Sequence, residues 1–123
     1  MKKILLVEDE ISYIKLLRDQ LTSKGYEVIE ATNGKDGLLL ALKETPDLIL
    51  LDIKMPGMDG ITMLDLLRAD PKGKSIKVIM LTNLEPDMKI INNAIEDHLT
   101  HYFVKSDTKF ADLLEKIKEV LTN

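Results

Sequence analysis

The sequence predicts an α/β fold built on a five-stranded parallel sheet. Short apolar segments alternate along the chain with longer amphipathic segments, which is the pattern of strands connected by helices. The segments ILLV at 4–7 and LILL at 48–51 are apolar without interruption, which indicates strands buried on both faces. The length of 123 residues suffices for one domain with its own hydrophobic core.

Residue spacing and a glycine mark the first two strand–helix units. Lys3–Glu8 is expected to be a buried strand, and Ile11–Lys24 a helix that Gly25 follows as helix-ending glycines do. Glu27–Ala31 is more polar and alternating, so this second strand should lie near an edge of the sheet, and Lys35–Lys43 should form the second helix. The apolar positions of the first helix are Ile11, Ile14, Leu17 and Leu21.

Proline and aspartate mark the boundaries of the remaining elements. Pro46 precedes the third strand, and Asp59 is placed to cap a third helix. Asp70-Pro71 should end that helix, because the residue before proline disfavours the helical conformation. Pro86 suits the first turn of a fourth helix. The remaining strands are expected at Asp47–Asp52, Lys77–Thr82 and Tyr102–Lys105, and the remaining helices at Asp59–Ala69, Pro86–Asp97 and Lys109–Leu121.

Composition and charge exclude several classes of function. The net charge is −4, acids and bases are interleaved, and aromatic residues make up 4% of the chain, so we expect no direct nucleic-acid binding. The absence of cysteine excludes a disulfide framework and a thiolate metal site. The N-terminal segment MKKILLVEDE is too short in apolar residues for a signal peptide or a membrane span. We therefore expect no membrane insertion and a cytoplasmic location.

Polar residues gather where the predicted strands end. Glu8 and Asp9 follow the first strand, and Asp52, Thr82 and Lys105 end the third, fourth and fifth. The carboxyl ends of parallel strands meet at one edge of the sheet, where such folds bind ligands. Two carboxylates about 5 Å apart repel by roughly 3 kcal/mol, so three of them favour a cation such as Mg²⁺ among them. A carboxylate also serves as a nucleophile toward phosphoryl groups, which makes Asp52 a candidate phosphoacceptor.

Four motifs at these positions resemble the receiver domains of two-component response regulators. They are VEDE at 7–10, LLDIKMPGMDG at 50–60, VIMLT at 78–82 and YFVK at 102–105. The resemblance extends from Lys3 to Leu121 and implies one receiver domain over residues 1–123. The implied fold is a flavodoxin-like, doubly wound sheet in the order 2-1-3-4-5 with five helices.

The resemblance also implies roles for the residues at the strand ends. Asp52 would accept the phosphoryl group, and Thr82 and Lys105 would bind the phosphoryl oxygens. Thr82 and Tyr102 would form the switch that responds to phosphorylation. The cofactor would be Mg²⁺ or another divalent cation such as Mn²⁺. Its implied ligands are Glu8 (through water), Asp9, Asp52 and the backbone carbonyl of Lys54.

The implied function is that of a phosphorelay switch rather than an enzyme. A sensor histidine kinase or phosphotransfer protein would donate the phosphoryl group. A downstream protein would bind the face formed by the fourth helix, the fifth strand and the last helix. The expected state is a monomer or a weak phosphorylation-dependent dimer. We expect no output domain after the last helix, and the chain is either a stand-alone receiver or part of a longer regulator.

Other interpretations stay open beside this one. The alternative function is a receiver-like docking domain that is not phosphorylated. A haloacid-dehalogenase-type phosphatase is disfavoured because Lys54 stands where such enzymes place a second acid. A nucleotide-binding module is disfavoured because no glycine-rich loop follows the first strand.

Single residues also have simpler interpretations. Asp52 alone could cap a turn, Tyr102 could be ordinary core, and His98 and His101 are expected to be loop histidines without a role. The chain departs from the pattern of the family at Asn83, His98-Leu99 and Ser106, the last of which stands where most receivers have proline.

Overall fold

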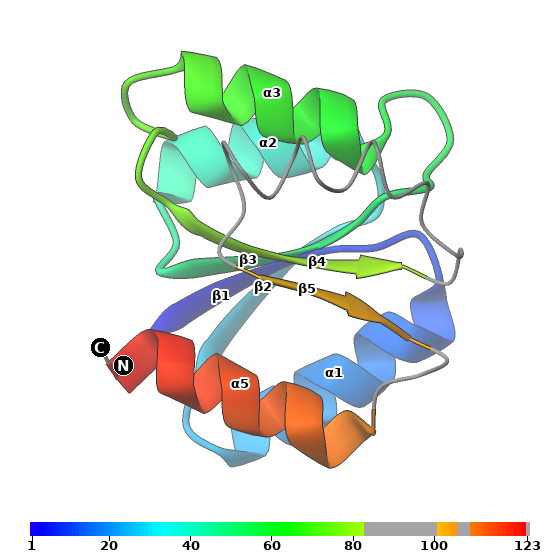
Figure 1. Cartoon of the computed structure of the whole chain (residues 1–123), viewed down its shortest axis with the longest axis vertical. Coiled ribbons are helices and arrows are strands. Elements are labelled where there is room, and N and C mark those ends of the chain that lie inside the picture. The colour runs from blue at the N-terminus through cyan, green and yellow to red at the C-terminus, as the bar shows by residue number, and fades with distance from the viewer. Residues whose placement is uncertain (83–100, 106–108, 123) are drawn as a thin grey trace.

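A five-stranded parallel sheet forms the middle of three layers (Figure 1). The computed structural model describes residues 1–82, 101–105 and 109–122. The strand order β2-β1-β3-β4-β5 confirms the predicted doubly wound sheet. The chain changes direction across the sheet at β1 and β3, which are neighbours, and a ligand site is expected beyond their carboxyl ends. The strands are β1 (Lys3–Val7), β2 (Glu27–Ala31), β3 (Leu48–Asp52), β4 (Lys77–Thr82) and β5 (His101–Val104).

Helices cover both faces of the sheet. In the described part of the chain, α2 (Gly34–Glu44) and α3 (Gly60–Ala69) lie on one face, and α1 (Ile11–Ser23) and α5 (Phe110–Thr122) lie on the other (Figure 1). The helix predicted at Pro86–Asp97 lies outside the described residues.

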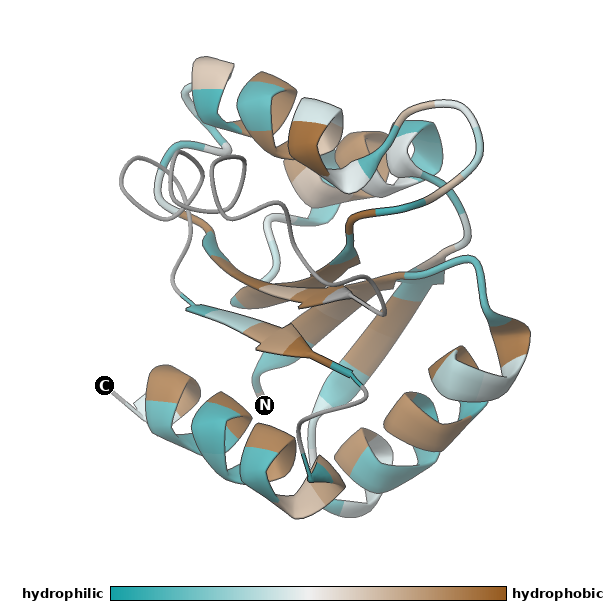
Figure 2. Ribbon diagram, turned by 45° about the vertical axis from the view of Figure 1, so that its right-hand side comes forward, coloured by the Kyte–Doolittle hydropathy of each residue, from teal (hydrophilic) through white to brown (hydrophobic). Residues whose placement is uncertain are grey.

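Two hydrophobic clusters separate the sheet from its helices. Side chains of β1, β3 and β4 alternate between the clusters, so that Leu5 and Ile49 face α2 and α3 whereas Ile4 and Leu48 face α1 and α5. Figure 2 shows the apolar strands enclosed between helices that turn their apolar sides inward. Coverage of both faces explains why these strands have no polar alternation.

Polar side chains cap the two helices of the first face. The Asp59 side chain accepts a hydrogen bond of 2.8 Å from the Thr62 backbone N–H, as the sequence predicted. The Asn33 side chain accepts a hydrogen bond of 2.8 Å from the Asp36 backbone N–H, a cap that we did not predict. Its signal in the sequence is an asparagine followed three positions later by an acid, which is close to a capping box.

Most element boundaries agree with the sequence within one or two residues, with a few corrections. The first strand ends at Val7 rather than Glu8, and β5 begins at His101, so the prediction of a loop at His101 was wrong. Ile11, the first of the apolar positions at helical spacing, is 64% exposed, unlike Ile14, Leu17 and Leu21. The reason is its place in the first turn of α1, beside the carboxyl end of β1, where the sheet no longer covers the helix.

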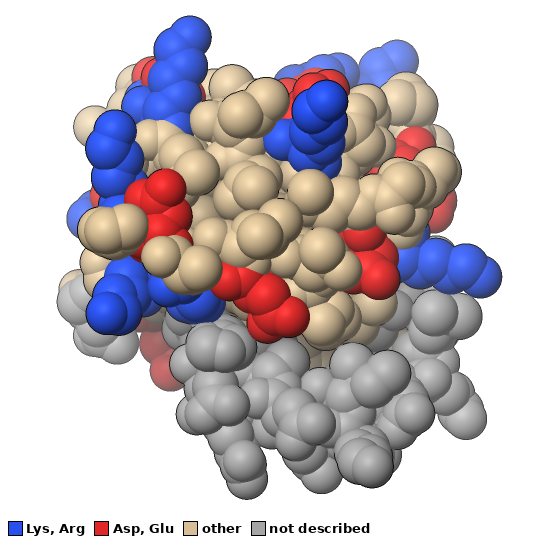
Figure 3. Space-filling view, turned by 90° about the horizontal axis from the view of Figure 1, so that it is seen from above, with Lys and Arg blue, Asp and Glu red and all other residues tan. Residues whose placement is uncertain are grey.

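The outer face of α2 and α3 is mixed in charge. Viewed from above, it carries acidic and basic side chains around an uncharged centre (Figure 3). Leu39 on α2 and Leu66 on α3 are 60% and 44% exposed. Within the described residues, none of the helices is long and apolar enough to cross a membrane.

Candidate functional site

The first two acids of the site follow β1 directly. The Glu8 backbone N–H donates to the Ala31 carbonyl at 3.1 Å, which continues the pairing with β2 by one residue. The Glu8 side chain is 3% exposed, and its Oε1 accepts a hydrogen bond of 3.1 Å from the Glu10 backbone N–H. Asp9 is exposed. The turn between β1 and α1 therefore presents one buried and one exposed carboxylate.

The third acid, Asp52, ends the central strand β3. It is 7% exposed and pairs in register with Leu81 of β4. The loop after it returns to the same strand end, where the Gly60 backbone N–H donates to the Ile53 carbonyl at 2.7 Å. A Cβ atom on Gly60 would lie 2.2 Å from the Asp52 carbonyl oxygen, so only glycine permits this close approach of α3. The start of α3 thus encloses the end of β3 that carries Asp52.

Lys105 reaches the acids from the far end of the chain. It follows β5 directly, and its Nζ atom donates to Glu8 Oε2 at 2.5 Å. The Lys105 side chain is 5% exposed, and that of Glu8 is 3% exposed. Its ammonium group also lies over the ring of Tyr13 in α1, 4.2 Å from the ring centroid. A buried cation therefore lies between a carboxylate and an aromatic face.

The three acids form one group that fits a divalent cation. Glu8, Asp9 and Asp52 each offer a carboxylate oxygen, and these oxygens lie within 4.8 Å of one another. Two of the residues are buried and Asp9 is exposed, so the group has a side open to solvent. Hard oxygen ligands with room for water are what Mg²⁺ prefers. Glu8, Asp9 and Asp52 could therefore hold such an ion together.

Electrostatics also single out Asp52. Burial is the main reason that the pKa of the Asp52 carboxyl is raised to about 7; Glu8 and Asp9 add to the rise, and Lys105 opposes it. A carboxylate with this pKa is costly to ionise unless positive charge lies beside it. A bound cation would supply that charge.

The other predicted residues lie on β4, on β5 and in the loop after β3. Thr82 ends β4 and pairs with Val104, the residue before Lys105. Lys54 lies exposed in the loop after β3. Tyr102 is partly buried against the α2–α3 side of the core. The departures from the family pattern at Asn83, His98-Leu99 and Ser106 lie outside the described residues.

One residue of the site was missed in the sequence. Tyr13 contacts Lys105, but an aromatic residue in the first turn of a helix is commonly part of the core, and nothing in its spacing links it to the last strand. The available signal was its place four positions after Asp9, one helical turn from the acids.

The chain matches a known domain family over almost its whole length. The family profile of the response regulator receiver domain matches residues 4–118. The response regulator PleD of Caulobacter vibrioides is 32% identical over 128 residues, which cover 95% of this chain and 28% of PleD. Sporulation initiation phosphotransferase F of Bacillus subtilis is 41% identical over 81 residues, which cover 68% of this chain and 64% of that protein. The chain thus spans less than a third of PleD.

Solved structures share the fold. A CheY-like response regulator receiver domain protein from Methanospirillum hungatei is 31% identical with a TM-score of 0.90, over 99% of this chain and 94% of that one. The receiver domain of the sensor histidine kinase PA1611 from Pseudomonas aeruginosa is 27% identical with a TM-score of 0.85, over 99% and 98% of the two chains. That structure is described with a magnesium ion coordinated in its active-site cleft.

Proposed function

Since the chain belongs to the response regulator receiver domains of two-component signalling, we propose that it is a switch activated by phosphorylation of Asp52. The donor is the phosphohistidine of a sensor histidine kinase or a phosphotransfer protein. Residues 1–123 act as one receiver unit. The observation that carries the proposal is the position of Asp52, at the buried end of the central strand beside two acids and a buried lysine.

The reaction transfers one phosphoryl group between two side chains. A carboxylate oxygen of Asp52 attacks phosphorus, the P–N bond to the donor imidazole breaks, and the imidazole leaves with the electron pair and takes up a proton. The product is an acyl phosphate on Asp52, which water later hydrolyses. The chain assists only its own phosphorylation and dephosphorylation, so it acts as a switch and not as an enzyme on external substrates.

The acids and the lysine have different roles in neutralising charge at the site. Glu8 (through water), Asp9, Asp52 and the backbone carbonyl of Lys54 would hold Mg²⁺ or a similar divalent ion such as Mn²⁺. When bound, this ion neutralises charge on the phosphoryl oxygens. Lys105 donates a hydrogen bond to Glu8, and it would bind a phosphoryl oxygen. Thr82, which ends the neighbouring strand, would bind another.

The conformational response to phosphorylation involves the last third of the chain. Thr82 moves toward the phosphoryl group. Tyr102, which is partly buried in β5, turns inward at the same time. A downstream protein then binds the face made by residues 86–97, β5 and α5. Phosphorylation acts by shifting the population between two states of this face, in a monomer or a weak phosphorylation-dependent dimer.

Intact-mass measurement tests the proposal directly. The protein is incubated with acetyl phosphate, with and without Mg²⁺, and Asp52→Asn serves as the matched control. We expect the mass of one phosphoryl group to be gained only with Mg²⁺ and only by the wild-type chain. No gain under any condition would refute phosphorylation and favour the alternative, a docking domain that takes no phosphate.

A further inference from the structure

We propose that Tyr13 is a positioning residue of the phosphoryl site, whose ring face holds the ammonium group of Lys105 in place when Glu8 shares its charge with a bound cation. This inference rests on the proposed function and adds a residue to it. It assigns a role in the site to a residue in the first turn of α1, in addition to the acids that precede this helix.

The ring and the ammonium group are held by different parts of the fold. Tyr13 belongs to α1, and its backbone N–H donates to the Glu10 carbonyl at 3.1 Å, directly beside the acidic turn. Lys105 follows β5. The Lys105 Nζ atom lies 4.2 Å from the ring centroid, a distance at which a cation is attracted by an aromatic face.

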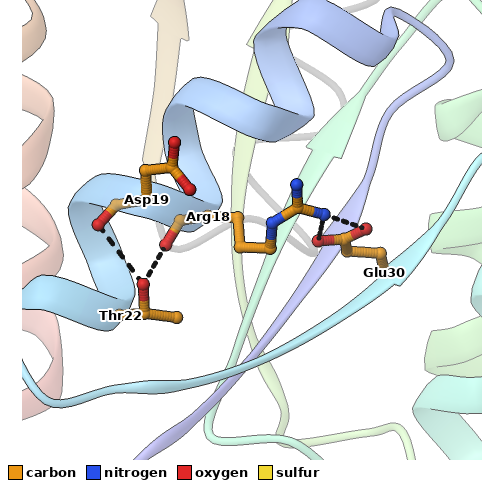
Figure 4. A network of polar contacts seen from close by, with 4 residues as sticks. All are labelled: Arg18, Asp19, Thr22 and Glu30. Carbon is orange, nitrogen blue, oxygen red and sulfur yellow. Dashed lines mark hydrogen bonds and ion pairs between the residues drawn. The ribbon is translucent and has the colours of Figure 1, made fainter.

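Helix α1 fixes the ring without help from Lys105. Ile14, Leu17 and Leu21 bury one side of the helix against the sheet. Farther along the helix, Arg18 Nη1 donates to both carboxylate oxygens of Glu30 on β2, at 2.8 and 3.1 Å (Figure 4). The contacts that hold α1 therefore do not involve Lys105.

A bound cation would compete with Lys105 for the charge of Glu8, even where Glu8 reaches the cation through water. In the described part of the chain, the buried ammonium group has two partners, Glu8 Oε2 at 2.5 Å and the Tyr13 ring. With the charge of Glu8 shared between the two, the ion pair of the buried ammonium group weakens. The ring attraction does not depend on Glu8 and persists. When the ring is removed, the metal-free state still has the full Glu8 ion pair, whereas the metal-bound state keeps a buried ammonium group with only a weakened partner. The metal-bound state therefore loses more.

The phenol group of Tyr13 does not compete for the cation. Burial, with Glu8, Glu10 and Asp52 nearby, raises the pKa of Tyr13 to about 12. The side chain stays neutral at physiological pH, so it offers Lys105 an uncharged ring face. This predicts that Tyr13→Phe keeps the function and that an aliphatic residue does not.

The simpler interpretation is that Tyr13 only fills the core, since it also packs against the α1–α5 cluster. Tyr26 provides the matched control. It packs against the same cluster but lines a groove of about 590 Å³ with Lys24 and Leu114, beside the opposite end of α1. Tyr26→Leu removes a ring from the core and leaves the site intact.

The test compares Tyr13→Leu, Tyr13→Phe and Tyr26→Leu with the wild type in two measurements. The first is the NMR signal of the Lys105 side chain in the metal-free protein, which the Tyr13 ring shields. The second is Mg²⁺ affinity by titration without a phosphodonor. Tyr13→Met is made as well, so that a folded variant without the ring is at hand.

We expect the Lys105 signal to lose its ring shift in Tyr13→Leu, and Mg²⁺ to bind about fivefold more weakly there. Tyr13→Phe and Tyr26→Leu should match the wild type. Unchanged signals and affinity in Tyr13→Leu and Tyr13→Met, or equal losses in Tyr13→Phe, would overturn the inference. If the wild-type chain takes up no phosphoryl group from acetyl phosphate, the proposed function fails, while these two measurements still decide the role of Tyr13.

Discussion

Lys105 Nζ lies 2.5 Å from Glu8 Oε2, although the two residues are 97 positions apart in the chain. The pair joins the first strand to the last across β3 and β4, and both side chains are almost completely buried. A buried charge is tolerated only beside its partner. The pair therefore links the stability of the fold to the state of the site.

The first prediction concerns this pair. Lys105→Gln leaves the buried carboxylates of Glu8 and Asp52 without their cation, so we expect the free energy of unfolding to fall by about 3 kcal/mol. Mg²⁺ should restore part of the loss, because it supplies positive charge to the same acids. Urea unfolding with and without Mg²⁺ measures both effects. In Lys116→Gln, which breaks a partly exposed pair with Glu119, we expect little change. Equal losses in the two variants would contradict the prediction.

The second prediction concerns pH. The pKa of Asp52 in the folded chain is about 7, whereas an aspartate in an unfolded chain has a pKa of about 3.9. Between these values the folded state binds more protons than the unfolded state, so the free energy of unfolding of the metal-free protein falls as the pH rises from about 4 to about 7. Asp52→Asn should abolish this decrease in the free energy of unfolding and stabilise the metal-free protein by about 2 kcal/mol above pH 7. This gain is smaller than the full rise in the Asp52 pKa would give, because the site is open to solvent at Asp9.

Thermal unfolding in a chelator at several pH values checks this prediction. The melting temperatures of the wild type and Asp52→Asn should coincide near pH 4 and separate as the pH rises. Added Mg²⁺ should reduce the difference in melting temperature above pH 7, because it stabilises the wild type alone. A constant difference at every pH would show that Asp52 does not titrate in this range.

The third prediction concerns the approach of α3 to the phosphoacceptor. In Gly60→Ala the new Cβ atom would lie 2.2 Å from the Asp52 carbonyl oxygen and 3.0 Å from its carbonyl carbon. Because backbone atoms cannot move aside as a side chain can, we expect a loss of more than about 2 kcal/mol and slower phosphorylation. Gly57 is the control, since its φ is 75° and a Cβ there meets nothing within 4 Å.

Gly57→Ala should lose about 1 kcal/mol through backbone strain alone. Denaturant unfolding and the rate of phosphorylation by acetyl phosphate distinguish the two variants. If Gly57→Ala proved the more harmful, contact with β3 would not be what requires Gly60.

The fourth prediction concerns the Arg18–Glu30 pair. Its side chains are 41% and 28% exposed, and pairs of this kind contribute less than about 1 kcal/mol. Ile14, Leu17 and Leu21 on the same helix each bury a side chain worth about 2 kcal/mol. Arg18→Met should therefore change stability little and leave Mg²⁺ affinity unchanged, whereas Leu17→Ala should be strongly destabilising. Chemical unfolding of both variants decides which contacts hold α1.

The sequence predicted the fold and the grouping of the acids because both follow from topology. Apolar runs identify parallel strands, and the carboxyl ends of such strands share one edge, so Glu8, Asp9 and Asp52 had to meet. Asp59 was recognised as a cap because capping is local. Helical spacing did not distinguish the exposed Ile11 from the buried apolar residues of α1, because spacing does not say where the sheet stops covering the helix.

Side-chain pairing between distant elements was beyond the sequence. Lys105 was expected to serve the phosphoryl group, but its bond to Glu8 and its place over Tyr13 depend on how β5 and α1 meet in space. No spacing pattern in the sequence indicates that β5 and α1 come together. The position of Lys105 relative to Glu8 and Tyr13 is therefore known only from the structure.

The acidic residues of β2 have a consequence for behaviour at high concentration. As an edge strand, β2 offers unpaired backbone groups to any other extended chain, which invites sheets to join between molecules. Glu27 and Glu30 place charged side chains along this edge, where they pair with Lys3 and Arg18. A second chain that paired with this edge would have to displace or bury these charged groups, so they discourage intermolecular sheet extension and aggregation.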